Sequence, residues 1–302
     1  MKISVVIPFY NRDEYLERTL NSVLMNQHYI DSLILVDNCS SDNSVELAQR
    51  FLESHPEISA RLLKCKKSGA AAARNVGLQH VTTEYVYFFD SDDEMSPEFL
   101  RQVTETLEKT PCDLLACTTR IVFPNGREHV RRYGFSNRPA HQIATAFLST
   151  QSMIMRTEFL RKCGGWDERL LYWNDWELGC RLLLHEPDVR FMQEAVFHRI
   201  YAHSDSLTGT SYSAHVQDAI KAFLVVKEDI MAAPANLRRE SLWALTKRQY
   251  IVAGHMRTEG NKAAAQAILA LGQEMPASAW QRLYGRLLYG YTALGGRGAW
   301  RL

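Results

Sequence analysis

Three carboxylates follow directly on an apolar, aromatic run in the first third of the chain. The run Tyr85–Phe89 is typical of a buried strand, and Asp90, Asp92 and Asp93 come immediately after it. Packing gives no reason to gather three like charges at one strand end, because they repel one another. A divalent cation such as Mg²⁺ or Mn²⁺ would relieve that repulsion and leave coordination positions for substrate phosphates. The alternative interpretation of the same residues is a solvated acidic loop.

Alternating strands and helices are expected to position these carboxylates. The apolar patterns predict strands over 3–7, 33–36, 61–65, 85–89 and 113–117, and helices over 13–26, 41–54, 70–80 and 97–109. Such alternation is typical of an α/β protein with a mostly parallel sheet flanked by helices. We therefore interpret residues 1–118 as a nucleotide-binding half.

The pattern becomes less regular after residue 118. A Pro-Asn-Gly turn at 124–126 predicts a β-hairpin between 120–123 and 127–133. Further strands are expected over 151–155, 189–191 and 195–201, and a helix over 175–185. We interpret 119–210 as the substrate-binding half of the same domain. Residues 211–302 are interpreted as a helical C-terminal extension with breaks at Pro234, near Gly260 and at Pro276.

The composition of the whole chain narrows the possible functions. The 302 residues are 46% apolar and carry a formal charge of +1, so no excess of positive charge suggests nucleic-acid binding. No apolar run approaches the roughly 20 residues of a membrane-spanning helix. Residues 1–8 are expected to form a first strand and not a signal peptide. The six cysteines form no Cys-x-x-Cys pair, which is typical of buried thiols in a reducing cytoplasm.

Polar side chains also follow the other strands of the predicted sheet. The carboxyl ends of the strands line one crevice in a doubly wound sheet, where ligands bind. Asp37 could accept hydrogen bonds from a base or a ribose, and the fork of Arg74 suits pyrophosphate oxygens. Gly69 permits a close backbone approach at a helix start. A capping turn is the alternative interpretation of Asp37 to Asp42, because Asp and Asn side chains readily bond to nearby backbone groups.

Five segments, in this order, resemble glycosyltransferase family 2, whose members are inverting sugar transferases with the GT-A fold. They are Ser-Val-Val-Ile-Pro-Phe-Tyr-Asn-Arg (4–12), Val-Asp-Asn (36–38), Gly69 with Ala-Arg-Asn-x-Gly-Leu (73–78), Phe-Asp-Ser-Asp-Asp (89–93), and Gly-Gly-Trp-Asp-Glu (164–168) with Asn-Asp-Trp-Glu-Leu-Gly-x-Arg-Leu (174–182). The resemblance spans roughly residues 1–205, and it depends on the five segments occurring in the same order as in the family. Two positions depart from the family pattern, since Cys39 replaces the usual Gly and Asn174 the usual Glu. The first suggests a slightly different turn, and the second leaves Asp175 without its usual acidic neighbour.

The resemblance implies a donor site for a nucleotide sugar in the first half. Asp37 would bind the nucleobase, and the backbone around Pro8 and Tyr10 would flank it. Arg74 would lie near the base and the phosphates, and Asp90 would contact the ribose.

The resemblance also implies a metal and a catalytic base. Asp92 would hold Mn²⁺ or Mg²⁺, and His203, in a His-x-x-Ser-like segment, would reach the metal. Asp175 would deprotonate the acceptor hydroxyl, with a helix cap as the alternative interpretation and Glu177 as the fallback base. His198 is a weaker candidate, since a lone His is more often a surface or core residue.

Aromatic residues suggest two further contacts. Trp166, Trp173 and Trp176 could form an acceptor platform or simply pack in the core. Residues 280–301 mix bulky apolar residues with arginines and contain no acid, as in a helix that contacts anionic lipid. A helix packed on the core or in a dimer is the alternative.

The predicted protein is a metal-dependent, hexosyltransferase-type enzyme. It would move a sugar from a nucleotide-diphosphate donor, expected to be a UDP-sugar, to a hydroxyl of a saccharide or lipid-linked saccharide. The expected setting is cell-surface polysaccharide biosynthesis in the cytoplasm, with peripheral contact at the inner face of the membrane. A non-catalytic nucleotide-sugar-binding module is one alternative. A sugar-1-phosphate nucleotidyltransferase is the other, although 8–12 lacks the Gly-rich loop of those enzymes.

Overall fold

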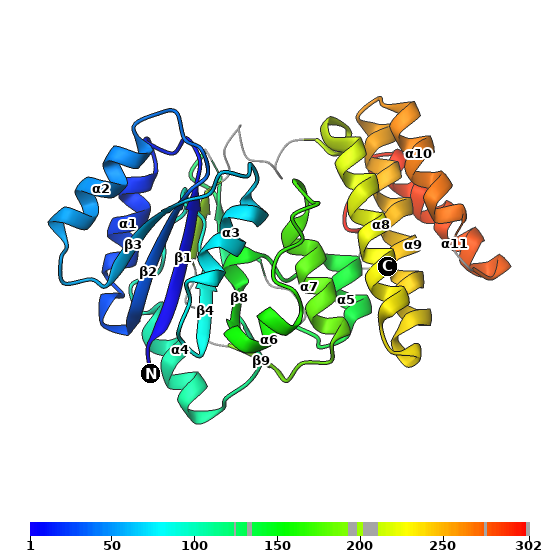
Figure 1. Cartoon of the computed structure of the whole chain (residues 1–302). Coiled ribbons are helices and arrows are strands. Elements are labelled where there is room, and N and C mark those ends of the chain that lie inside the picture. Colours follow the sequence, from blue (N-terminus) through cyan, green and yellow to red (C-terminus); the bar gives the residue numbers. More distant parts are fainter. Residues whose placement is uncertain (124, 132–134, 193–197, 202–210, 275–276, 300–302) are drawn as a thin grey trace. The chain divides into compact units, whose positions relative to one another are not determined.

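The computed structural model describes residues 1–123, 125–131, 135–192, 198–201, 211–274 and 277–299 (Figure 1). The chain divides into two compact units. The sheet unit comprises Met1–Phe135, Leu148–Leu171 and Pro187–His203, and the helical unit comprises Ser136–Phe147, Tyr172–Glu186 and Ser204–Leu302. The functional division into 1–118, 119–210 and 211–302 stays a prediction.

A seven-stranded sheet forms the centre of the sheet unit, in the order β3-β2-β1-β4-β8-β5-β9. Its strands are β1 (Ile3–Phe9), β2 (Ile30–Asp37), β3 (Ala60–Lys64), β4 (Tyr85–Phe88), β5 (Leu114–Ala116), β8 (Met153–Arg156) and β9 (Val189–Phe191). β8 runs antiparallel to β4 and β5, and the other neighbours are parallel. Every residue of β1 and β4 is buried, which is why both strands are apolar except for Ser4. The predicted mostly parallel sheet is confirmed.

Helices and a small second sheet complete this unit. The helices are α1 (Leu16–Leu24), α2 (Ser44–Ser54), α3 (Ala70–Gln79), α4 (Phe99–Lys109) and α6 (Thr157–Lys162), with 3₁₀ turns at Gln27–Tyr29 and Thr150–Ser152. The second sheet has the order β10-β6-β7, with β6 (Thr119–Val122), β7 (Glu128–Arg131) and β10 (His198–Tyr201). The antiparallel pairing of β6 with β7 confirms the predicted hairpin.

Small residues let α3 lie close to the sheet. Its first turn is a run of alanines, and a Cβ at Gly77 would overlap Val6 on β1. This close approach gives the glycine of the Ala-Arg-Asn-x-Gly segment a packing role. It also fixes α3, and with it Arg74 and Asn75, against the centre of the sheet.

The helical unit is built around the long helix α9. Its elements are α5 (Pro139–Thr145), α7 (Asn174–Leu184), the 3₁₀ turn Tyr212–His215, α8 (Val216–Ala232), α9 (Ala235–Thr258), α10 (Lys262–Gln273) and α11 (Ala279–Ala293). α9 contacts α5, α8, α10 and α11. The helix ends near Pro234, Gly260 and Pro276 confirm the predicted breaks. No helix in the described part of the chain is long and apolar enough to cross a membrane.

Candidate functional site

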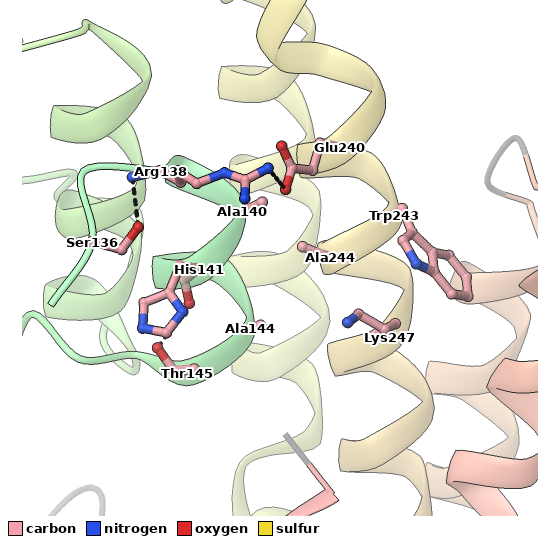
Figure 2. A pocket seen from close by; sticks show the side chains of 10 residues that line it. All are labelled: Ser136, Arg138, Ala140, His141, Ala144, Thr145, Glu240, Trp243, Ala244 and Lys247. Atoms are coloured by element: carbon pink, nitrogen blue, oxygen red, sulfur yellow. Dashed lines mark hydrogen bonds and ion pairs between the residues drawn. The ribbon is translucent and has the colours of Figure 1, made fainter. Parts of the chain in front are cut away.

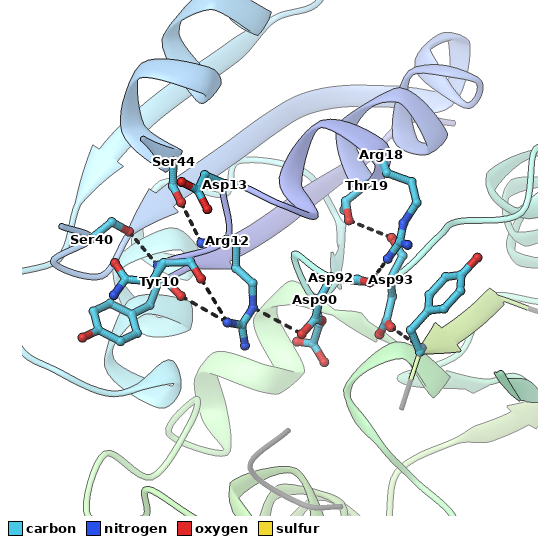
Figure 3. Close-up of polar contacts among 12 residues, drawn as sticks. Tyr10, Arg12, Asp13, Arg18, Thr19, Ser40, Ser44, Asp90, Asp92 and Asp93 are labelled. Atoms are coloured by element: carbon cyan, nitrogen blue, oxygen red, sulfur yellow. Dashed lines mark hydrogen bonds and ion pairs between the residues drawn. The ribbon is translucent and has the colours of Figure 1, made fainter. Parts of the chain in front are cut away.

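The loop after β4 places two of the three carboxylates next to arginines. Asp90 Oδ1 accepts a hydrogen bond from Arg74 Nη2 at 2.8 Å. Asp92 Oδ2 lies 3.3 Å from Arg12 Nε (Figure 3). Both carboxylates are partly exposed, so a ligand can reach them. The guanidinium groups of Arg12, after β1, and Arg74, on α3, therefore offset part of the negative charge of these carboxylates.

Asp93 differs from its neighbours because it is only 2% exposed. Its Oδ1 accepts from the Tyr201 backbone N–H at 2.8 Å, and its carbonyl oxygen accepts from Thr19 Oγ1 at 2.8 Å. Burial raises the pKa of its carboxyl well above the usual range, and the charges of Asp92 and Asp90 raise it further. Asp93 therefore anchors the loop to α1 and β10.

Gln151 joins the buried and the accessible carboxylates. Its Nε2 donates to Asp90 Oδ2 at 2.6 Å and to Asp93 Oδ2 at 2.5 Å. Its backbone carbonyl accepts from the Tyr87 hydroxyl at 2.9 Å. Sequence analysis missed this residue, which was placed in a strand without a role. Nothing near residue 151 signals it, because its partners lie about 60 residues away along the chain and β8 brings it to them.

His198 is part of the interior. It is fully buried, with Nε2 2.9 Å from the Tyr87 hydroxyl and Nδ1 accepting from the Ser96 backbone N–H at 3.2 Å. Its ring packs edge-on against the Phe99 ring, with the two ring centroids 4.1 Å apart. Burial lowers the pKa of His198 to about 3. A neutral, enclosed ring of this kind stabilises the core, so the weaker metal-site candidate acts structurally. His203, the stronger candidate, lies outside the described residues.

The end of β2 forms the second part of the site. Asp37 is 3% exposed, and its Oδ1 accepts from the Ser40 backbone N–H at 2.8 Å. Asn38 donates to the Lys67 carbonyl at 2.7 Å and accepts from the Gly69 N–H at 2.8 Å, which ties the end of β2 to the start of α3. Asp42 bonds to the backbone N–H groups of Asp13 and Ser44, as the capping interpretation expects.

Cys39 adopts a backbone conformation that favours glycine. Its φ is 67°, in the left-handed region. Its thiol lies 3.3 Å from the Cys65 carbonyl oxygen. The departure from the family's usual Gly therefore introduces backbone strain at the turn after β2.

The end of β1 presents an aromatic ring. Pro8 lies within β1, opposite Val36, and Tyr10 is 54% exposed. Arg12 holds this turn in place, because its guanidinium donates to the Asn11 carbonyl at 3.1 Å and its backbone N–H donates to Ser44 Oγ at 2.7 Å (Figure 3). An exposed ring on a braced turn is suited to stacking against a planar base.

Asn75 explains why the Ala-Arg-Asn and Gly-Gly-Trp-Asp-Glu segments occur together. Its amide bonds to both the N–H and the carbonyl of Trp166, each at 2.9 Å, and to Glu168 Oε1 at 2.8 Å. Next to it, the Arg74 guanidinium lies 4.3 Å over the Trp166 ring, and Arg74 is only 6% exposed. The Trp166 loop therefore stacks on Arg74 and limits where its guanidinium can lie.

In the helical unit, Asp175 lies in the first turn of α7. Its Oδ1 accepts from the Trp176 backbone N–H at 2.8 Å, and the residue is half-buried. A helix N-terminus stabilises the charged form of a carboxylate. Arg248 stacks on Trp173 and Trp176 and donates to the Ala144 carbonyl at 3.2 Å. Burial lowers the pKa of the Arg248 guanidinium, against smaller opposing contributions that include Asp175.

Glu177 and the three candidate tryptophans are packing residues. Glu177 is fully buried, and its Oε1 accepts from Arg181 Nε at 2.5 Å, so the fallback base has no access to an acceptor. Trp166, Trp173 and Trp176 are 2%, 8% and 2% exposed. These three rings therefore pack in the interior of their units, which confirms the core-packing interpretation.

The donor atoms after β4 fit a metal that is held partly by its substrate. Mg²⁺ and Mn²⁺ bind one or two carboxylates together with substrate phosphates and water. Asp92 and Asp90 supply hard oxygen ligands of this type. Among the residues that the structure describes, no group of three or more His, Cys, Asp or Glu side chains could hold a metal. A metal bound here would need further oxygen ligands, of the kind that a substrate phosphate supplies.

A separate groove of about 450 Å³ lies in the helical unit between α5 and α9 (Figure 2). Small side chains line its middle. At one end, Arg138 and Glu240 form an ion pair, with Nη2 and Oε1 2.5 Å apart. Burial lowers the pKa of the Lys247 ammonium in its wall. None of the predicted site residues lines this groove. Its lining residues are Ser136, Arg138, Ala140, His141, Ala144, Thr145, Glu240, Trp243, Ala244 and Lys247.

The fold is that of the GT-A glycosyltransferases, with a large, mostly parallel sheet flanked by helices. The family model described as glycosyl transferase family 2 matches residues 4–164. The chain therefore belongs to glycosyltransferase family 2. This result confirms the resemblance on which the site was predicted.

Two curated relatives each match less than half of the chain. The uncharacterized glycosyltransferase YibD of Escherichia coli is 33% identical over 122 residues, which are 40% of this chain and 35% of YibD. The poly(ribitol-phosphate) beta-N-acetylglucosaminyltransferase TarS of Staphylococcus aureus is 30% identical over 130 residues, which are 42% of this chain and 22% of TarS. The match thus spans about a third of YibD and about a fifth of TarS.

Solved structures match nearly the whole chain at low identity. A fragment of S. aureus TarS, residues 1–349, in complex with UDP-GlcNAc has a TM-score of 0.73 at 18% identity, over 100% of this chain and 90% of that one. The mannosyltransferase PcManGT of Pyrobaculum calidifontis, in complex with GDP-Man and Mn²⁺, has a TM-score of 0.58 at 17% identity, over 97% and 85%. At these identities the likeness shows the fold.

Proposed function

We propose that this chain transfers a sugar from a UDP-sugar to a hydroxyl of a saccharide or lipid-linked saccharide, with inversion at the anomeric carbon. Membership of glycosyltransferase family 2 supports the reaction type. The observation that carries the proposal is the position of Asp37, Asp90 and Asp92 at the carboxyl ends of β2 and β4, which lie on either side of β1 in one sheet, where α/β folds bind nucleotides. The TarS fragment, which shares the fold, was solved with UDP-GlcNAc.

The donor is bound by residues of the sheet unit. The Asp37 carboxylate accepts hydrogen bonds from the base, and Pro8 and the exposed Tyr10 ring flank it. Asp90 accepts hydrogen bonds from the ribose. Arg74, already paired with Asp90, attracts the diphosphate, because a guanidinium binds phosphate oxygens in a fork.

Asp92 is the residue proposed to hold Mn²⁺ or Mg²⁺, with His203 as a second ligand. The bound cation would supply Lewis-acid stabilisation of the departing diphosphate. Arg12 Nε, at 3.3 Å from Asp92 Oδ2, would orient that carboxylate. The PcManGT structure contains Mn²⁺ on a similar fold.

Asp175 is proposed as the catalytic base. Its carboxylate takes the proton of the acceptor hydroxyl while that oxygen forms a bond to the anomeric carbon. The bond from this carbon to the diphosphate breaks in the same step, and the nucleoside diphosphate departs with the electron pair. A single displacement of this kind inverts the anomeric carbon, through a state with oxocarbenium character.

We propose that the reaction serves the synthesis of a cell-surface polysaccharide in the cytoplasm. The name of TarS, a poly(ribitol-phosphate) glycosyltransferase, supports a polymeric acceptor. Peripheral contact with the inner face of the membrane through residues 280–301 belongs to the same proposal. A non-catalytic nucleotide-sugar-binding module remains the main alternative, ahead of a sugar-1-phosphate nucleotidyltransferase.

A donor screen tests the proposed function. The protein is incubated with UDP-, GDP- and dTDP-sugars in Mn²⁺, and release of the free nucleotide is measured with and without EDTA. We expect UDP release from a UDP-sugar that EDTA suppresses and that Asp175→Asn slows. Binding of a donor with the same turnover in wild type and Asp175→Asn would favour a binding module. If no donor is bound or hydrolysed, the proposed function is wrong.

A further inference from the structure

Helix α11 is held to the helical unit by one narrow face. Gly285, Leu288 and Thr292, spaced three and four residues apart, are its buried residues. A Cβ at Gly285 would overlap the Tyr250 ring of α9, and Thr292 lies against Gly254 of the same helix. Leu288 packs with Ile251 of α9, and Tyr284 packs against this pair, so the contact with α9 combines small side chains with one apolar cluster. Figure 1 shows α11 beside α9. Most other large apolar residues of α11 lie on a different face.

A second stripe of α11 is apolar and exposed. Its members follow the same three- and four-residue spacing, which places them along one side of the helix. They make up five of the twelve large apolar residues that are exposed in the described part of the chain. We call them the exposed stripe: Trp280 (80% exposed), Leu283 (48%), Leu287 (63%), Tyr291 (45%) and Leu294 (90%). Such a continuous apolar row on a surface indicates a binding face.

The charge around the exposed stripe has one sign. Arg282, Arg286 and Arg297 are exposed, and residues 277–299 contain no Asp or Glu. Pairing with a second copy of α11 would bring arginines of both copies together with no acid of this segment to offset them. A negatively charged surface with an apolar layer beneath it matches both the arginines and the stripe.

We propose that the exposed stripe binds the surface of a bilayer that contains anionic lipids. The helix would lie in the plane of the interface, with the stripe at the acyl boundary and the arginines at the headgroup phosphates. Trp280 and Tyr291 suit this depth because each has an apolar ring and a polar group. The proposal specifies the face and the lipid charge for the membrane contact proposed above, and it is independent of the donor chemistry.

Flotation with defined vesicles tests this proposal. The full chain is mixed with phosphatidylcholine vesicles that contain either no phosphatidylglycerol or 30% of it, and is then centrifuged on a density gradient without any donor. We expect the protein to float with the anionic vesicles, to stay behind with the neutral ones, and to bind less as the salt concentration rises. The double variants W280S/L287S and R282E/R286E should each lower the partition coefficient roughly tenfold or more.

Matched controls come from other exposed positions of the same unit. L224S/M231S removes two exposed apolar residues of α8, and R239E/R257E reverses two exposed arginines of α9. Both should float like the wild type, and circular dichroism should show that all four variants are folded. Absence of flotation with anionic vesicles would overturn the proposal, as would equal loss in the controls. Wild-type dimers that W280S/L287S dissociates, without lipid binding, would assign the stripe to a second copy. A negative result leaves the proposed sugar transfer untouched, because no donor is used.

Discussion

The sheet unit and the helical unit hold their candidate catalytic carboxylates in different ways. Asp90 and Asp92 lie in a loop, where each pairs with an arginine from another element of the sheet unit. Asp175 lies in the first turn of a helix and bonds to the N–H of the next residue. The first arrangement is a charge network built from distant residues, whereas the second is largely local. The two kinds of carboxylate should therefore respond differently to substitution.

The largest expected effect is the difference between Asp92→Asn, which should weaken donor binding, and Asp175→Asn, which should slow only the chemical step. Asp92→Asn removes a proposed metal ligand, so it should weaken binding of UDP with Mn²⁺ and also lower kcat roughly 10²–10³-fold. Asp175→Asn removes the proposed base, so it should lower kcat about 10²–10⁴-fold and leave the Kd for UDP and Mn²⁺ unchanged. Calorimetry with UDP and Mn²⁺, together with donor turnover, measures both quantities.

Exposed aspartates provide controls for these two variants. Asp188→Asn changes a surface pair in the sheet unit, and Asp218→Asn changes one in the helical unit. Neither should alter binding or turnover measurably. An Asp92→Asn variant with wild-type affinity for UDP and Mn²⁺ would remove the difference between the two carboxylates.

The next effect is on the free energy of unfolding, and it compares a buried glutamine in each unit, Gln151 and Gln142. Gln151→Leu leaves the buried Asp93 carboxylate with one donor fewer and Asp90 without its second partner, so we expect a loss of about 2–3 kcal/mol in the free energy of unfolding. The same substitution at Gln142, whose Nε2 donates to the Trp176 carbonyl at a longer 3.4 Å, should cost about 1 kcal/mol. Urea denaturation measures both. Equal losses would show that the carboxylate network adds nothing beyond one buried amide.

Sequence patterns predicted the strands of the sheet unit well because they are short apolar runs, and β1, β4 and β5 are buried along their whole length. The predicted 189–191 coincides with β9, and the predicted 85–89 differs from β4 by one residue. The breaks between the C-terminal helices were equally clear, because Pro and Gly interrupt helices by local geometry. The short helices α5 and α6 were missed, since 7 and 6 residues carry too little periodic pattern to detect.

The candidate site could be predicted only where its residues belong to local motifs. Asp37, Asp90 and Asp92 directly follow strands, so the order of elements was enough to bring them to one edge. Arg12 and Gln151 acquire their partners through long-range contacts, about 80 and 60 residues away. No local pattern marks such contacts, because side-chain placement across the sheet depends on how the strands pair.

His198 gives the sheet unit a pH dependence. Its folded pKa of about 3 lies below the value of 6.5 for an unfolded histidine, so the unfolded chain binds more protons between these values. The stability contributed by neutral His198 is thus present above pH 6.5 and is lost as the pH falls toward 3. At pH 5 this loss amounts to about 2 kcal/mol. His198→Gln should flatten that part of the stability profile measured by urea denaturation at pH 4.5–7.5. An unchanged slope would contradict a buried, neutral His198.

The smallest expected effect on stability comes from a strained backbone conformation that is found in both units. Cys39 and Trp173 both have left-handed φ values, 67° and 58°, which strain a residue with a side chain. In the helical unit, the packing of the Trp173 ring against Phe223 and under Arg248 offsets this strain. Cys39 is exposed and makes only weak thiol contacts.

Cys39→Gly should therefore raise the free energy of unfolding by about 0.5–1 kcal/mol, because relief of the strain exceeds the entropy that glycine adds to the unfolded chain. Cys39→Ala is the matched control, since it removes the thiol and keeps the strain, and it should give no gain. If alanine stabilises as much as glycine, the thiol and not the backbone is the source of the strain at this turn. Thermal unfolding of the three proteins at one pH decides between these outcomes, and donor turnover shows whether the turn after β2 tolerates the family's usual residue.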